Sequence, residues 1–193
     1  QQMEKDGRND FEFADICWTA HRYDKVREVL GAIEPPEGKE LGWLMMMADS
    51  CYELEDYEAA WKYRKEIWDG CDEEGRVEAL YLDMARDCGL SGRVEEALEL
   101  YCQTGERFGE SAELYYLQAK LLSDNEQAAE AMEMCEKALK LEFHLEAFKL
   151  RTEILFDRNA YALIKEETGD LLAKGLKSAQ VMFDYARALR KLD

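Results

Sequence analysis

The chain has 193 residues and is strongly acidic, with 43 aspartate and glutamate residues against 25 lysine and arginine residues and a formal net charge of −18. This charge repels a phosphate backbone, so nucleic acid is not expected as a partner. Hydrophobic residues make up 47% of the chain, which excludes a disordered acidic tail. No apolar run approaches the ~20 residues that a membrane-spanning helix needs, so no membrane segment is expected.

Helical periodicity divides most of the chain into pairs of amphipathic helices. The predicted helices, in chain order, are 10–22, 23–33, 39–54, 56–69, 76–89, 93–104, 112–123, 126–141, 146–156, 161–174 and 178–192. The prolines and glycine of 34–38, the acidic stretch 70–75 and the glycine-flanked stretch 105–109 are predicted to interrupt the helices. The sequence therefore predicts an all-α chain.

Two columns of small residues recur along these helices. The first column, in the first helix of each pair, contains Ala14, Ala48, Ala85 and Ala119. The second column, in the second helix, contains Val26, Ala60, Ala97 and Ala131. Small residues let two helices approach closely, and a period near 34 residues is typical of a solenoid of helix–turn–helix repeats.

The repeated segments resemble those of the tetratricopeptide repeat (TPR) family. The resemblance is carried by MADSCYELEDYEAAWKYRKEIW, MARDCGLSGRVEEALELY and QAKLLSDNEQAAEAMEMCEKALKLE. It implies a single right-handed superhelical solenoid of antiparallel helix hairpins, with about five repeats plus a C-terminal helix. The expected repeats are 7–40, 41–77, 78–111, 112–145 and a divergent 146–177, followed by a terminal helix at 178–193.

The C-terminal part departs most from the family pattern. Lys165 stands where the second column requires a small residue, so the packing of the fifth hairpin is expected to differ. The last helix carries an apolar stripe of Val181, Met182, Tyr185, Ala188, Leu189 and Leu192. We expect this helix to cap the solenoid. In the alternative interpretation the chain is a piece of a longer protein.

The six cysteines include no CxxC pair and have no histidine at zinc-ligand spacing, so no metal site is predicted. Cys17, Cys51 and Cys88 each follow a first-column alanine by three residues, and we expect them to be small buried thiols. Free thiols are typical of a reducing compartment, which predicts a cytoplasmic protein.

The sequence contains no phosphate-binding glycine loop, no GxSxG elbow and no HExxH motif. Its two histidines, His21 and His144, fall in different predicted hairpins. We therefore expect no enzyme, no catalytic residue and no cofactor. An enzyme stays an alternative that a co-purifying cofactor or metal would favour.

The resemblance implies that the first helix of each hairpin lines a concave groove. The residues expected there are Phe11, Asp15, Trp18, Met45, Asp49, Tyr52, Leu82, Arg86, Tyr116, Lys120 and Arg151. Trp18 and Tyr52 are the expected aromatic anchors, and Met45 is the methionine of Met45-Met46-Met47 expected to face the groove. The family's clamp for a chaperone's terminal carboxylate is not expected, because acids occupy the corresponding positions.

These features predict a non-catalytic protein–protein interaction module, a scaffold that binds a peptide or protein segment in its groove. Residues 1–100 carry 26 acidic and 12 basic residues, which favours a partner with basic segments. The alternative is a self-associating, homo-oligomeric helical tail of a larger protein such as a co-chaperone or regulator.

Overall fold

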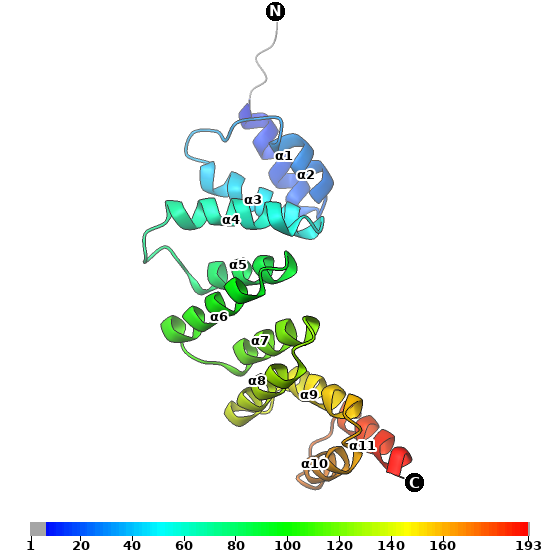
Figure 1. Ribbon diagram of the computed structural model, residues 1–193. Helices are drawn as coiled ribbons and strands as arrows, with labels where there is room; N and C mark the ends of the chain where they lie inside the picture. Colours follow the sequence, from blue (N-terminus) through cyan, green and yellow to red (C-terminus); the bar gives the residue numbers. More distant parts are fainter. Residues whose placement is uncertain (1–6, 193) are drawn as a thin grey trace, which may run out of the picture. The chain divides into compact units, whose positions relative to one another are not determined.

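The computed structural model describes residues 7–192, and these residues form eleven α-helices and no strand (Figure 1). The chain divides after Phe108 into two compact units. Unit 1 contains α1 (Gly7–Thr19), α2 (Tyr23–Leu30), α3 (Glu40–Glu53), α4 (Tyr57–Gly70), α5 (Glu78–Leu90) and α6 (Val94–Phe108). Unit 2 contains α7 (Ala112–Asp124), α8 (Ala128–Leu141), α9 (Leu145–Asp157), α10 (Tyr161–Ala173) and α11 (Ala179–Leu192).

All eleven predicted helices are present, and the all-α class is confirmed. The largest difference at a C-terminal end is in α6, where the sequence predicted a break from Gly105 and the helix continues to Phe108. The Phe108 ring packs edge-on against Tyr81 of α5, with ring centroids 5.6 Å apart. One glycine inside a helix costs only about 1 kcal/mol relative to alanine, which such contacts offset. The path of a single superhelix through all repeats stays a prediction.

The five hairpin turns share one backbone conformation. In each, one residue has a left-handed φ between 55° and 84°: His21, Glu55, Gly92, Glu126 and Asn159. The next residue's N–H donates to the carbonyl five residues earlier, as from Asp56 to Cys51 and from Arg93 to Cys88, both at 2.8 Å. This pattern satisfies carbonyls at the helix end and reverses the chain within two or three residues.

The two small columns lie in the core of the units. Every first-column alanine is at most 1% exposed, and every second-column residue is 0% exposed. Cys17, Cys51 and Cys88 are buried and unpaired, as expected for small core thiols. The spacing of small residues therefore predicted correctly where the paired helices make their closest contacts.

In the fifth hairpin the buried position shifts by one residue. Lys165 is exposed, and Ile164 beside it is 1% exposed. Thr168 is also buried, and its hydroxyl donates to the Ile164 carbonyl at 2.6 Å. The packing of α10 thus differs from that of the other second helices, as expected, because a branched residue replaces the small one.

The predicted stripe of α11 is partly wrong. Val181 and Ala188 are fully buried, but Met182 is 51% exposed and Leu192 is 47% exposed. Asp184 is buried in their place, and both its oxygens accept hydrogen bonds from the Gln180 amide at 3.1 Å. The buried face of α11 is therefore narrower than the apolar stripe in its sequence.

No helix within residues 7–192 combines the length and apolar character needed to span a membrane.

Candidate functional site

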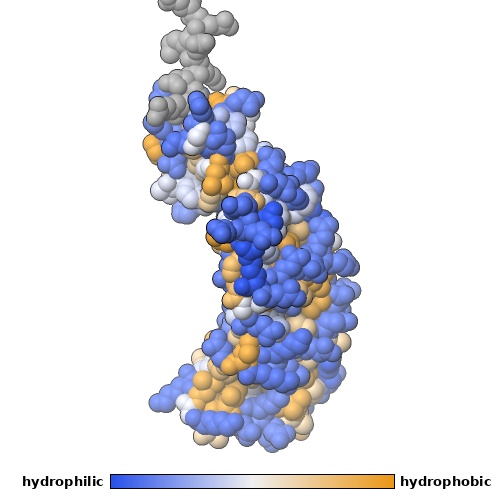
Figure 2. All heavy atoms as spheres, turned by 90° about the vertical axis from the view of Figure 1, so that its left-hand side faces the viewer, coloured by the Kyte–Doolittle hydropathy of each residue, from blue (hydrophilic) through white to orange (hydrophobic). Residues whose placement is uncertain are grey.

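The predicted groove residues lie on first helices of both units. Unit 1 carries eight of them on α1, α3 and α5, and unit 2 carries three on α7 and α9. Asp15, Met45, Arg86 and Lys120 are exposed. The others are half-buried: Phe11, Trp18, Asp49, Tyr52, Leu82, Tyr116 and Arg151. On the face drawn in Figure 2, hydrophilic side chains predominate and hydrophobic side chains form separate patches.

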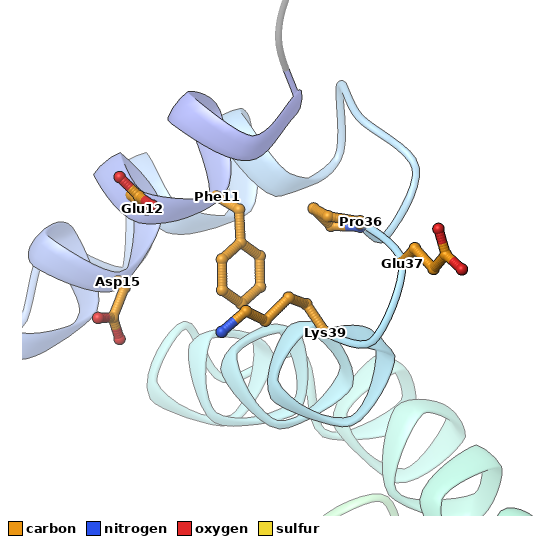
Figure 3. Close-up of a pocket in the computed structure, with 6 residues that line it drawn as sticks. All are labelled: Phe11, Glu12, Asp15, Pro36, Glu37 and Lys39. Atoms are coloured by element: carbon orange, nitrogen blue, oxygen red, sulfur yellow. The ribbon is translucent and has the colours of Figure 1, made fainter.

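Phe11 and Asp15 line a shallow hollow where α1 meets the start of α3. Figure 3 shows the Phe11 ring pointing from α1 toward α3, with the Lys39 side chain running past it. The ring packs against the core of unit 1, and Asp15 lies at the rim with Glu12 and Glu37. Phe11 therefore acts mainly in packing the first two hairpins together.

Trp18 and Asp49 connect α1 to α3. The Trp18 ring packs against the core of unit 1. Burial of the Asp49 carboxyl is the main cause that raises its pKa, while the charge of Arg64 and, more weakly, the Trp18 side chain act in the opposite direction. The net pKa of Asp49 is raised, and the negative charge of Asp83 contributes to the increase.

Arg64 of α4 is the centre of a buried ion cluster that joins three helices. Its side chain is only 6% exposed, and its Nη2 donates to Asp49 Oδ1 of α3 at 3.0 Å. Its Nη1 donates to Asp87 Oδ2 of α5, and its Nε lies 3.9 Å from Asp83 Oδ2 of the same helix. We call Arg64, Asp49, Asp83 and Asp87 the Arg64 cluster.

Asp87 is the most deeply buried member of the Arg64 cluster, with its side chain 0% exposed. Burial raises the pKa of Asp87 to about 6, although Arg64 opposes the shift. Its Oδ1 has no hydrogen-bond partner among the described residues. Removing this carboxylate from water therefore costs free energy on folding at neutral pH. The ion pair with Arg64 offsets part of that cost.

We expect Asp87 to make the stability of unit 1 pH-dependent. Its folded pKa of about 6 lies above the ordinary aspartate value of 3.8, so the folded state binds the proton more tightly. The stabilisation that comes from this tighter proton binding is therefore fully present below pH ~4 and is lost as the pH rises through 6. Urea titrations of wild type and Asp87→Asn between pH 4.5 and 7.5 measure this. The stability of wild type relative to the variant should rise as the pH falls, and a constant difference would contradict the assignment.

Tyr52 lies beside the Arg64 cluster, between two guanidinium groups. The Arg64 guanidinium carbon is 5.7 Å from the centroid of its ring, and that of Arg86 is 5.6 Å away. Arg86 also pairs with Asp83 at 3.2 Å. Cation–π contacts of this kind hold an aromatic ring in place, so Tyr52 is held as part of a surface that continues from α3 to α5.

A pocket of about 210 Å³ opens between α3, α4 and α5. Its apolar lining comes chiefly from Leu41, Met45, Ile67, Val77 and Leu80. Its charged lining comes from three members of the Arg64 cluster, Asp49, Arg64 and Asp83. Met45 is 49% exposed, whereas Met46 and Met47 are buried. We call this cavity the α3–α5 pocket.

The unit 2 residues are arranged differently. Tyr116 packs its ring against His144, with centroids 5.2 Å apart, and Lys120 is exposed. Arg151 donates through both terminal nitrogens to Glu167 of α10, and its Nε lies 3.8 Å from Glu136 of α8. Arg151 is thus held by carboxylates on the second helices of unit 2.

Sequence reasoning missed Arg64, Asp83 and Asp87. Arg64 follows the buried Ala60 by four residues, so a cation lies on the apolar stripe of its helix. A charge in such a position signals a buried partner, which is the sign that could have identified it. In the part of the chain that the structure describes, no group of three or more histidine, cysteine, aspartate or glutamate side chains could hold a metal ion.

Solved structures of TPR proteins share this fold. The C-terminal part of a TPR repeat-containing protein from Cytophaga hutchinsonii has a TM-score of 0.75 at 16% identity, over 95% of this chain and 71% of that chain. A tetratricopeptide repeat protein from Parabacteroides merdae has a TM-score of 0.68 at 14% identity, over 96% and 73%. A chain in the structure of Naa15/Naa10 bound to HypK-THB has a TM-score of 0.66 at 13% identity, over 92% and 28%.

No family model matches the sequence, and a search of curated proteins finds no relative. At identities of 13–16% the structural likeness is one of fold. It confirms the resemblance to TPR proteins at that level. The chain has an α-solenoid fold built from TPR-like helical hairpins.

Proposed function

We propose that the chain is a non-catalytic protein-interaction scaffold that binds a peptide or protein segment on the first-helix surface of unit 1. This surface is formed by Trp18, Met45, Asp49, Tyr52 and Arg86. The observation that carries the proposal is the α3–α5 pocket, which opens between two successive first helices and has the half-exposed Met45 at its wall.

The chemistry of this surface suits a peptide. Aromatic and arginine side chains supply a large share of binding energy in protein interfaces, and here Tyr52 lies against Arg86. A half-exposed methionine can adjust its side chain to different partners. Tyr52 and Arg86 are already in contact, so ordering them on binding costs less conformational entropy than ordering free side chains.

The structural comparisons support a protein partner in general terms. The similar chain in the Naa15/Naa10 structure belongs to an assembly bound to HypK-THB. Proteins with the same fold thus take part in protein complexes, which makes the same use of the hairpins a reasonable proposal for this chain. The acidic balance of residues 1–100 favours a partner segment that is basic.

The test is selection from a random displayed peptide library on the full chain. The Met45→Ser/Tyr52→Ala variant should bind the selected peptides at least ~10-fold more weakly, because each side chain is an exposed or half-exposed part of the surface. A matched control, Leu141→Ser/Phe143→Ala, removes two exposed apolar side chains of unit 2 and should keep full affinity. Equal affinity of all three proteins, or no selection at all, would overturn the proposal.

A further inference from the structure

We infer that the α3–α5 pocket receives a lysine or arginine side chain of the bound segment. This inference rests on the proposed function, because the side chain belongs to a peptide held on the first-helix surface. It adds the chemical class of the residue that the surface selects.

The size of the pocket favours a single side chain. Its volume is about 210 Å³, below the ~300–1,000 Å³ of sites that enclose a small-molecule ligand. Most of the lining is apolar, and Asp49 and Asp83 contribute carboxylates to it. A long side chain with an apolar stem and a charged end matches both parts, because lysine and arginine bury their methylene groups along apolar surface.

The sign of the charge favours a cation. Within the Arg64 cluster one guanidinium faces three carboxylates, and Arg86 adds a second positive charge through Asp83. The linker that lines the pocket through Cys71 and Gly75 carries three further acids, 72–74, between those two residues. Arg76 and Arg107 also lie at this linker, where they donate to the carbonyls of Trp68 and Glu73, so the six carboxylates in and around the pocket outnumber four guanidinium groups.

The carboxylates in the lining are still accessible to a ligand. The side chain of Asp49 is 34% exposed and that of Asp83 is 36% exposed, although both belong to the Arg64 cluster. Burial is the main cause that raises the pKa of Asp49, while the charge of Arg64 opposes the increase and the charge of Asp83 adds to it. A cation on the exposed side of the two carboxylates would face both negative charges.

Other side chains fit less well. An acidic side chain would meet Asp49 and Asp83 at close range and be repelled. A purely apolar side chain would cover the two carboxylates without replacing the water they lose, which carries a desolvation cost. A neutral polar side chain offers no opposite charge, so the lysine and arginine side chains match the lining best.

The experiment compares residue preferences among peptides selected by the full-length proteins from the same random library. Wild type should enrich lysine or arginine at one position of the selected peptides. Asp49→Asn/Asp83→Asn, which keeps the shapes of both side chains, should lose that enrichment. Asp24→Asn/Glu28→Gln is the matched control, because it makes the same change in net charge on exposed residues of the second helix α2, outside the first-helix surface. The control should retain the wild-type preference.

A second measurement changes the peptide instead of the protein. A selected peptide and its copy with norleucine in place of lysine, or citrulline in place of arginine, are titrated against wild type by isothermal calorimetry. The substituted peptide should bind ~10-fold more weakly or worse, since it lacks the charge that pairs with the carboxylates. This comparison tests whether the pocket binds a charged side chain even if Asp49→Asn/Asp83→Asn is too unstable to study.

The outcomes separate the inference from the proposed function. Selected peptides without a basic preference, or equal affinity of the two matched peptides, would overturn the inference and leave the first-helix surface as the binding site. Peptides that bind equally to Met45→Ser/Tyr52→Ala, or failure to select any peptide, would overturn both. If the matched control also lost the preference for a basic residue, that preference would come from the overall charge of the chain. The α3–α5 pocket would then be rejected as its source.

Discussion

Replacing Arg64 with methionine is expected to lower the free energy of unfolding of unit 1 by about 3–5 kcal/mol. The substitution preserves an unbranched side chain on the buried face of α4 but removes the charge that pairs with Asp87. Asp87 is fully buried, so its carboxylate would be left desolvated without a cation. All four tryptophans lie in unit 1, at 18, 43, 61 and 68, so tryptophan fluorescence during urea unfolding measures this unit.

Two further variants make this test specific. Lys62→Met makes the same chemical change on the same helix, at a lysine whose side chain is 63% exposed, and should shift stability by no more than ~0.5 kcal/mol. Arg64→Met/Asp87→Leu removes both buried charges and should recover much of the loss, because apolar replacement of a buried pair is often neutral. Equal effects of Arg64→Met and Lys62→Met would show that the Arg64 cluster does not support unit 1.

Replacing Ile164 with alanine is expected to lower the free energy of unfolding of unit 2 by about 2–5 kcal/mol. Ile164 is 1% exposed and occupies the place of the second small column in α10, so its truncation leaves a cavity between packed helices. Unit 2 contains no tryptophan, and its unfolding is followed by far-ultraviolet circular dichroism. Tryptophan fluorescence in the same titration should show unit 1 unchanged.

The neighbours of Ile164 provide the controls on one helix. Leu163→Ala removes a side chain that is 40% exposed and should cost less than ~1 kcal/mol. Lys165→Ala changes an exposed residue and should stay within ~0.5 kcal/mol. A larger loss from Lys165→Ala than from Ile164→Ala would mean that the column falls on Lys165, as simple counting along the sequence suggests.

The helices and the closest helix contacts were predictable because they depend on local spacing. Periodicity identified all eleven helices, and the two columns of small residues marked positions that are in fact buried. The misses occur where a contact outside the local pattern of apolar residues accompanies the difference. The packing of Phe108 on Tyr81 accompanies the continuation of α6 past Gly105, and the narrow buried face of α11 leaves Met182 exposed.

The candidate site was predictable only in part. The family geometry directed attention to first helices, and Met45 is exposed at a pocket between two of them. The Arg64 cluster depends on side chains from α3, α4 and α5 meeting in space, which no spacing within one helix reveals. Arg151 shows the same limit, since carboxylates on two other helices determine where its guanidinium lies.

The hairpin turns bear on how far such a sequence can diverge while its fold persists. The same left-handed turn is occupied by histidine, glutamate, glycine, glutamate and asparagine in successive hairpins, although only glycine adopts it without steric cost. What the five hairpins have in common is thus a backbone conformation, and the first four also share two columns of small buried residues. Mutations can accumulate at most other positions, so the fold remains similar after the sequences have diverged. This accounts for a fold shared with TPR structures at 13–16% identity when no family model recognises the sequence.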